Sequence, residues 1–148
     1  MTTGDARRAA QAPRGVQPGA RPAMSVLFVD PDLVGAQRLA DAINDRYAVA
    51  VVSSARQAWE TMRRGLPNVV VTELDLPDTS GLELIRAIYA TPATHNVYLL
   101  VVTARTGIRD KIAAFQAGAD DFLVKPIEPS QFDMHLQLVA RFRRVLGS

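Results

Sequence analysis

The sequence predicts an α/β domain in which five parallel strands alternate with five helices. Three observations support this fold class. Short β-rich runs alternate with longer segments whose apolar residues have helical spacing. The β-rich runs are continuously apolar, which is typical of strands covered on both faces, as in a parallel sheet. Because crossovers between parallel strands are right-handed, the helices must lie on both faces of a doubly wound sheet.

The expected strands are the β-rich runs Ser25–Val29, Tyr47–Val52, Asn68–Thr72, Asn96–Val102 and Asp121–Val124. The expected helices follow them at Leu33–Arg46, Ala55–Arg64, Leu82–Tyr89, Arg109–Ala117 and Gln131–Leu146. Glycine or proline ends two of these helices, at Gly65, Pro67 and Gly118. Trp59 and Met62 are three residues apart in the second helix, so both are expected to contact the core.

Length and composition limit the possible classes of protein. The 148 residues suffice for one domain, and a hydrophobic content of 48% excludes a wholly disordered chain. The absence of cysteine excludes disulfides and thiolate metal sites and fits a reducing compartment. No apolar run approaches the roughly 20 residues of a membrane helix, and no secretory leader is recognisable. We therefore expect a cytoplasmic protein with no membrane partner.

The net charge of +2 is unevenly distributed. Residues 1–23 carry four arginines against one aspartate, whereas residues 24–148 carry a net charge of −1. Residues 1–23 are rich in alanine, arginine and proline, so we expect a flexible arm, either without a function or serving as an interaction tail. Residues 24–148 form the expected domain, and their near-neutral charge makes nucleic acid an unlikely partner.

Polar side chains follow the predicted strands where each strand ends. They are Asp30 and Asp32 after the first strand, Glu73 and Asp75 after the third, Thr103 after the fourth and Lys125 after the fifth. The carboxyl ends of parallel strands meet at one edge of the sheet, where such folds bind ligands. Pro126 restricts Lys125 to extended geometry, which can direct its side chain across this edge. We therefore expect these residues to form one pocket.

Several segments together resemble the receiver domain of bacterial two-component response regulators. They are VLFVD at residues 26–30, VVTAR at 101–105, AGADDFLVKP at 117–126 and the turn from Pro77 to Gly81. The similarity extends from about Met24 to Leu146. It implies a flavodoxin-like (βα)5 fold with strand order 2-1-3-4-5 and a signalling module that is not an enzyme.

The resemblance also implies roles for individual residues. In that family an aspartate after the third strand accepts a phosphoryl group from a histidine kinase, and adjacent acids after the first strand help to hold Mg²⁺. Glu73 stands at the phosphoacceptor position and Asp30 at the first acid. Thr103 and Phe122 match the two switch positions, and Lys125 matches the lysine that binds the phosphoryl oxygens.

Two positions depart from the family pattern. Pro31 replaces the second acid and offers no side-chain oxygen, although Mg²⁺ requires near-octahedral oxygen ligands at about 2.0–2.1 Å. Asp32 comes one residue later, so its side chain points in another direction. Glu73 extends its carboxylate by about 1.5 Å, and a misplacement of about 1 Å can cost about 10²-fold in rate. We expect no cofactor, only a vestigial metal site of Asp30, Glu73 and Asp75.

Glu73 and Lys125 are expected to form an ion pair, because an unpaired charge in the pocket would be costly. Thr103 could join this pair. Glu73 could then imitate the phosphorylated state, or hold the domain in a state unlike either. Other interpretations remain open: Asp75 could accept the phosphoryl group in place of Glu73, and Asp30 or Asp32 could cap the first helix.

No effector domain is recognisable after the fifth helix, so we expect an atypical, stand-alone receiver that acts through protein–protein interaction. The alternative is a conventional Mg²⁺-dependent receiver phosphorylated by a histidine kinase. A further alternative is a nucleic-acid adaptor that uses the arginine-rich arm.

The expected partners are signalling proteins that bind the face made by the fourth helix, fifth strand and fifth helix. Its candidate residues are Arg109, Lys111, Asp120, Asp121, Phe122 and Arg141. The mixed charges would suit a two-fold homodimer, or simply solvation. Arg141, Arg143 and Arg144 could form a docking patch or interact with the helix dipole. Phe122 and Thr103 could also have purely structural roles.

Overall fold

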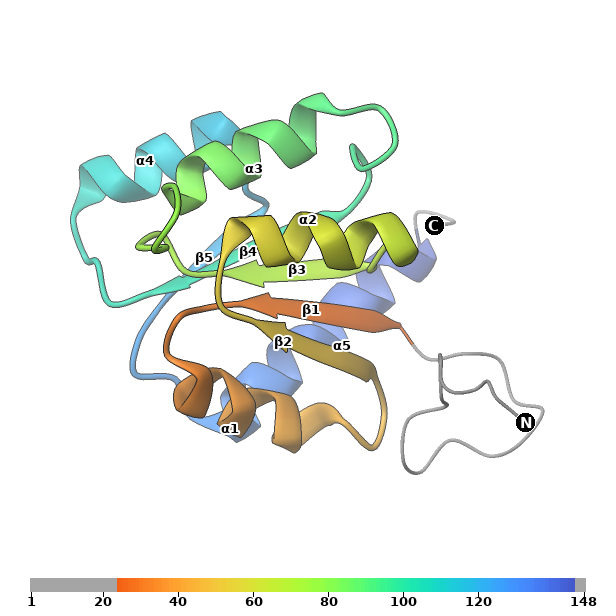
Figure 1. Cartoon of the computed structure of the whole chain (residues 1–148). Coiled ribbons are helices and arrows are strands. Elements are labelled where there is room, and N and C mark those ends of the chain that lie inside the picture. The colour runs from red at the N-terminus through yellow and green to blue at the C-terminus, as the bar shows by residue number, and fades with distance from the viewer. Residues whose placement is uncertain (1–23, 146–148) are drawn as a thin grey trace.

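Five parallel strands form a single sheet: β1 (Ser25–Val29), β2 (Ala48–Val52), β3 (Val69–Thr72), β4 (Tyr98–Thr103) and β5 (Asp121–Val124). The helices are α1 (Leu33–Ile43), α2 (Ala55–Arg64), α3 (Gly81–Ala90), α4 (Ile108–Ala117) and α5 (Pro129–Val145). The strand order is β2-β1-β3-β4-β5 (Figure 1), which confirms the expected flavodoxin-like fold. The structure, a computed structural model, describes residues 24–145, with side chains up to Phe142. The expected arm (residues 1–23) and the side chains of Arg143 and Arg144 lie outside this description.

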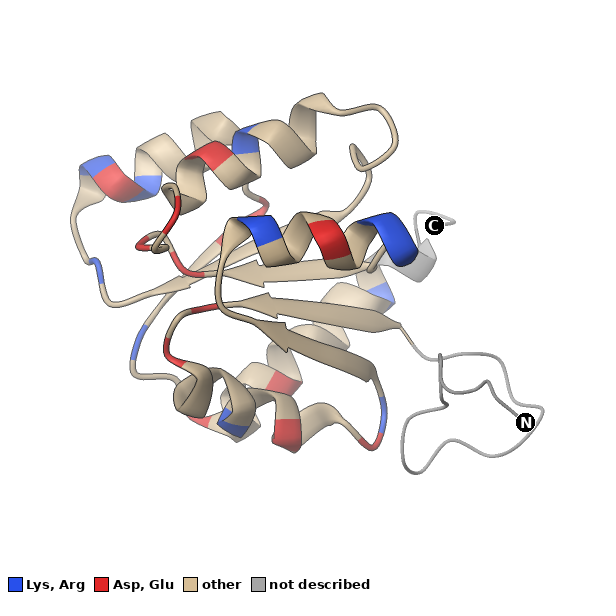
Figure 2. Ribbon diagram, viewed as in Figure 1, with Lys and Arg blue, Asp and Glu red and all other residues tan. Residues whose placement is uncertain are grey.

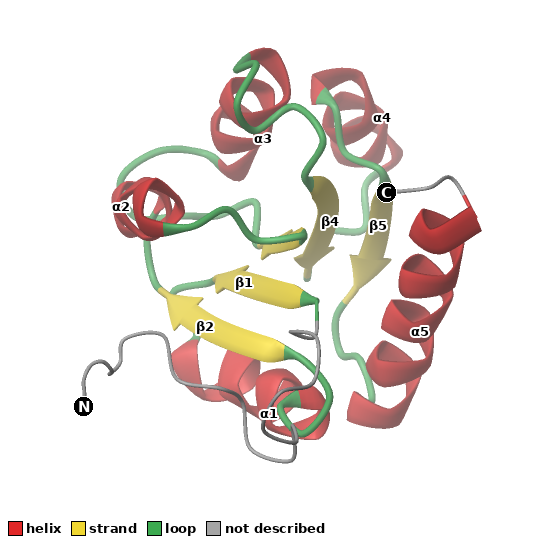
Figure 3. Cartoon of the chain, turned by 90° about the vertical axis from the view of Figure 1, so that its right-hand side faces the viewer, coloured by secondary structure: helices red, strands yellow, loops and turns green. Residues whose placement is uncertain are grey.

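Helices cover both faces of the sheet (Figure 3). Leu27 and Val29 of β1 belong to a buried cluster with residues of α2, α3 and α4. Val26 and Phe28, which alternate with them, belong to a second cluster with residues of α1 and α5. This arrangement explains why the strands read as continuous apolar runs. Within the described residues, no helix is both long and apolar enough to span a membrane.

Several element boundaries differ from those expected. The first helix ends at Ile43 and not at Arg46, because the N–H groups of Arg46 and Tyr47 both donate to the Ile43 carbonyl and close a turn. The last helix begins at Pro129, where proline suits the first helical turn because its missing N–H would have no partner there. Met62 is buried and Trp59 packs against the same cluster, which confirms both as core contacts of α2.

The start of α3 is attached directly to the segment that follows β3. Ser80 is the N-cap, and its hydroxyl accepts a hydrogen bond from the N–H of Glu83. The N–H of Gly81 donates to the Leu74 carbonyl at 2.8 Å. A Cβ atom at Gly81 would lie 2.2 Å from the Glu73 carbonyl oxygen, so only glycine permits this approach. Gly81 therefore helps to fix the backbone on which Glu73 sits.

Gly81→Ala should lower the free energy of unfolding by about 1–3 kcal/mol, because the added methyl group must displace backbone atoms. Gly65→Ala is the matched control, since nothing lies within 4 Å of a Cβ there and its extended φ of 175° suits any residue. We expect the control to change stability by less than about 1 kcal/mol. Urea unfolding followed by Trp59 fluorescence measures both, and equal effects would contradict the close approach.

Candidate functional site

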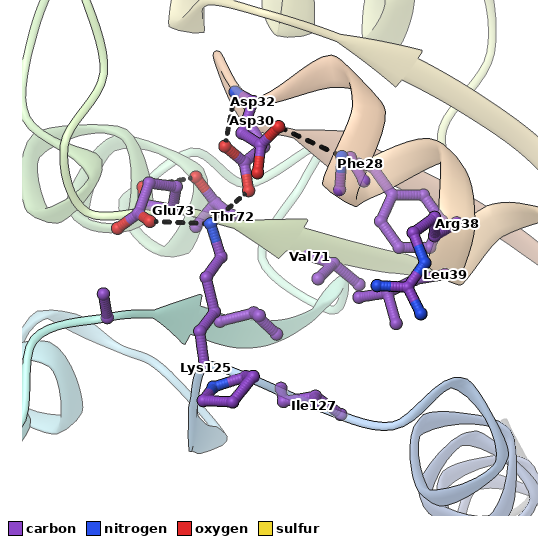
Figure 4. A pocket seen from close by; sticks show the side chains of 15 residues that line it. Phe28, Asp30, Asp32, Arg38, Leu39, Val71, Thr72, Glu73, Lys125 and Ile127 are labelled. Carbon is purple, nitrogen blue, oxygen red and sulfur yellow. Dashed lines mark hydrogen bonds and ion pairs between the residues drawn. The ribbon is translucent and has the colours of Figure 1, made fainter.

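Charged residues follow strands at the carboxyl edge of the sheet (Figure 2), and side chains from three strand ends meet there (Figure 4). Asp30 follows β1, Glu73 follows β3 and Lys125 follows β5. The Lys125 Nζ donates to Asp30 Oδ2 at 2.8 Å and to Glu73 Oε1 at 3.0 Å. The expected ion pair between Glu73 and Lys125 is thus present, and Asp30 is a second partner of the lysine that was not expected. We call these three residues the ion triad.

The ion triad is largely removed from solvent. Asp30 and Glu73 are each 7% exposed, and the Lys125 side chain is 27% exposed. The other oxygen of Asp30 accepts the N–H of Asp32 at 2.8 Å. The other oxygen of Glu73 accepts the N–H of Leu74 at 2.6 Å and that of Asp75 at 3.3 Å. Every carboxylate oxygen of the ion triad therefore has a hydrogen-bond donor, as buried charges require.

The two carboxylates also set the protonation of the lysine. Burial by itself lowers the pKa of Lys125, but the hydrogen bonds to Asp30 and Glu73 outweigh it and raise the pKa above its ordinary value. The ammonium is therefore charged at neutral pH, and the ion triad carries a net charge of −1. The Lys125–Pro126 peptide bond is cis.

The side chain of Asp75 lies apart from the ion triad. Its carboxylate forms a bidentate ion pair with Arg105, whose Nη2 lies 2.7 Å from Oδ1 and whose Nε lies 3.0 Å from Oδ2. The hydrogen bond from Arg105 lowers the pKa of Asp75. The Asp75 carboxylate therefore does not join those of Asp30 and Glu73, because Arg105 holds it on the exposed surface; the resemblance implies a ligand role for the backbone carbonyl at this position and not for the side chain. Among residues 24–145, no group of three His, Cys, Asp or Glu side chains is placed to hold a metal ion.

Asp32 and Thr103 bond to the backbone near them. Asp32 is the N-cap of α1, and its Oδ1 accepts the N–H of Gly35 at 3.0 Å. This is the contact that the capping interpretation of Asp32 predicts. Thr103 is fully buried, and its Oγ1 accepts the N–H of Arg105 at 3.3 Å. The option that Thr103 joins the Glu73–Lys125 pair is not realised, since its hydroxyl interacts with the β4–α4 connection.

The expected interaction face has one buried member. Phe122 is 7% exposed and packs with Ala114 and Ala117 of α4, so it supports the face from beneath and does not belong to its surface. The charged members Arg109, Lys111, Asp120 and Arg141 are exposed, and Asp121 is half-buried. Asp120 also accepts the N–H of Leu99 at 2.8 Å, which ties the start of β5 to β4.

Exposed apolar side chains on the same face were missed by the sequence analysis. They are Ile108, Ile112 and Phe115 on α4, and Met134, Leu138 and Phe142 on α5, with exposed fractions from 41% to 67%. The signal in α5 was a second apolar stripe with a spacing of four residues, beside the buried stripe of Phe132, Leu136 and Val139. The face therefore combines charged and apolar surface.

Comparison with known proteins gives a consistent result. The profile of the response regulator receiver domain matches residues 26–137. The chain is 37% identical to the transcriptional regulatory protein BasR of Escherichia coli over 122 residues, covering 82% of this chain and 53% of BasR. It is 32% identical to the virulence transcriptional regulatory protein PhoP of Salmonella typhimurium, covering 84% of this chain and 55% of PhoP. The chain thus spans about half the length of these curated relatives.

Solved structures show the same architecture. A putative response regulator from Chloroflexus aurantiacus superimposes with a TM-score of 0.72 at 30% identity, over 86% of this chain and 100% of that one. The chemotaxis response regulator CheY4 of Vibrio cholerae superimposes with a TM-score of 0.74 at 24% identity, over 79% of this chain and 98% of that one, and shows the fold alone. With the profile match and the two relatives, these likenesses lead to one assignment: the chain belongs to the response regulator receiver domain family of two-component signalling.

Proposed function

We propose that this chain is an atypical receiver that signals through protein–protein interaction without a Mg²⁺-dependent phosphoryl cycle. The observation that carries the proposal is the position of the Lys125 ammonium, bonded to both Asp30 and Glu73. Glu73 stands where the family resemblance places the phosphoacceptor aspartate. Its carboxylate is already bonded to a lysine and to backbone N–H groups, so it is not presented to an incoming phosphoryl group.

The residues at the strand ends do not fit a magnesium ion. Pro31 contributes no side-chain oxygen. Both oxygens of Asp30 accept hydrogen bonds, and a cation beside them would have to displace the Lys125 ammonium. Asp75 is held by Arg105. Because Mg²⁺ requires near-ideal octahedral oxygen coordination, these contacts favour a pocket that uses lysine in place of a metal ion.

We also propose that Glu73 holds the pocket in one fixed arrangement and does not imitate the phosphorylated state. A phosphoryl group at this position would engage both Thr103 and Lys125, according to the family resemblance. Of these two residues, Glu73 bonds to Lys125 only, while Thr103 bonds to the N–H of Arg105. The contacts of the ion triad thus differ from those that the resemblance implies for the phosphorylated form.

The output in this proposal comes from the α4–β5–α5 face. Its exposed isoleucines, leucine, methionine and phenylalanines form an apolar surface among charges of both signs. Exposed apolar patches of this kind mark protein interaction sites. The partner we propose is another signalling protein or a second copy of this chain, in the cytoplasm, and not nucleic acid.

Incubation with acetyl phosphate and Mg²⁺ should leave the intact mass of the protein unchanged, because Glu73 cannot present an in-line carboxylate beside a cation. Mass spectrometry at neutral pH measures this directly. A Mg²⁺-dependent addition of one phosphoryl mass would support the conventional receiver instead, and its loss in Asp75→Asn would identify Asp75 as the substitute acceptor.

Glu73→Asp alone should not restore Mg²⁺ binding, because Pro31 still supplies no oxygen. The double variant Glu73→Asp/Pro31→Asp should bind Mg²⁺ more tightly, by about tenfold or more. Isothermal titration of both variants with MgCl₂ provides the comparison. Equal Mg²⁺ affinity of the single and double variants would show that Pro31 does not limit the site.

Lys125→Met should lower the free energy of unfolding by about 1–3 kcal/mol, because two buried carboxylates lose their shared cation while most of the apolar stem is kept. Lys111→Met on exposed α4 removes the same charge and should change stability by less than about 0.5 kcal/mol. Urea unfolding at pH 7 measures both. Equal effects of the two substitutions would show that the ion triad contributes no stability of its own.

A further inference from the structure

A cavity lies between α1 and the β5–α5 connection, next to the ion triad (Figure 4). Its volume of about 370 Å³ is within the range of small-molecule binding sites. Most of its wall is apolar and comes from β1, α1, β3, β4 and the residues after β5: Phe28, Ala36, Leu39, Val71, Val102 and Ile127. Its lining is therefore that of a ligand site, with an apolar body and a few polar groups.

The polar groups of the lining differ in what they can still bind. All four oxygens of Asp30 and Glu73 accept hydrogen bonds from protein donors, whereas exposed Asp32 accepts the N–H of Gly35 with Oδ1 alone and, among the described residues, keeps Oδ2 as a free acceptor. The Lys125 ammonium has three N–H groups, of which two are used by Asp30 and Glu73. Arg38 also lines the cavity, and within the described part of the chain its guanidinium makes no hydrogen bond or ion pair. The unused polar capacity is thus mainly that of donors.

We propose that this cavity binds a small amphipathic carboxylate. The apolar body lies against Phe28, Leu39 and Ile127, and the carboxylate pairs with the Arg38 guanidinium, whose planar pair of donors matches a carboxylate. Figure 4 shows Arg38 on the side of the cavity away from Glu73, so the bound anion is kept apart from the two carboxylates of the ion triad.

Such a ligand would give this receiver a chemical input that needs neither phosphorylation nor a metal ion. The proposal goes beyond the proposed function and does not rest on it, because the apolar wall and Arg38, on which it depends, are not part of the ion triad. The ligand would contact α1 and the segment just after Lys125 together. The ligand would bind only the folded protein and so raise the melting temperature of the protein.

The test is a titration of the full chain, labelled with ¹⁵N, with 1-naphthoate, followed by two-dimensional NMR. For a ligand of about thirteen non-hydrogen atoms we expect a dissociation constant on the order of 1 mM. The amides of Gly35, Arg38 and Ile127 should show saturable shifts. Arg38→Gln should weaken binding about threefold or more. Arg63→Gln, which removes the same charge from exposed α2 on the other face of the sheet, should leave the affinity unchanged.

The sign of the ligand charge is tested with 1-naphthylmethylammonium, a cation of similar size. It should bind about threefold or more weakly than 1-naphthoate, because it cannot pair with Arg38. Equal or tighter binding of the cation would overturn the choice of a carboxylate. No saturable shift at about 10 mM naphthoate, or shifts confined to residues away from the cavity, would overturn the site itself. Neither result depends on whether Glu73 can be phosphorylated.

Discussion

The sharing of one lysine by two buried carboxylates is the interaction on which this site depends. Lys125 lies 2.8 Å from Asp30 and 3.0 Å from Glu73, and so joins residues that follow β1, β3 and β5. Without the ammonium, two carboxylates that are each 7% exposed would face each other with no cation between them. The Lys125 ammonium therefore supplies the positive charge that the two buried carboxylates share.

Because glutamate has one methylene more than aspartate, Glu73 connects the ion triad to the backbone that follows β3. Glu73 reaches Lys125 with one oxygen and turns the other back to the N–H groups of Leu74 and Asp75. The same segment is held from the other side by Gly81, whose N–H donates to Leu74 at the start of α3. Side-chain chemistry and backbone packing thus fix one short stretch after β3. The face that carries exposed apolar residues is built on α4 and α5, outside this stretch.

The continuous apolar runs predicted the parallel sheet, because strands covered on both faces carry no alternation. The strand order came from the family resemblance.

The Glu73–Lys125 pair was predictable, since a charge at a shared sheet edge needs a partner. The bond of Lys125 to Asp30 could not be predicted, because it depends on how far the lysine reaches across the sheet. The Asp75–Arg105 pair depends on the path of the β4–α4 connection. The exposed stripe of α5 was hidden because its spacing overlaps that of the buried stripe.

The central claim is that lysine occupies the place of the cation. The most direct measurement is a crystal structure of this chain grown with magnesium and beryllofluoride, which together imitate a phosphorylated receiver. The account predicts that the Lys125 Nζ stays within hydrogen-bond distance of both Asp30 and Glu73, with no metal ion between the carboxylates. A magnesium ion bound by Asp30 and Glu73, with beryllofluoride attached to the Glu73 carboxylate, would contradict it.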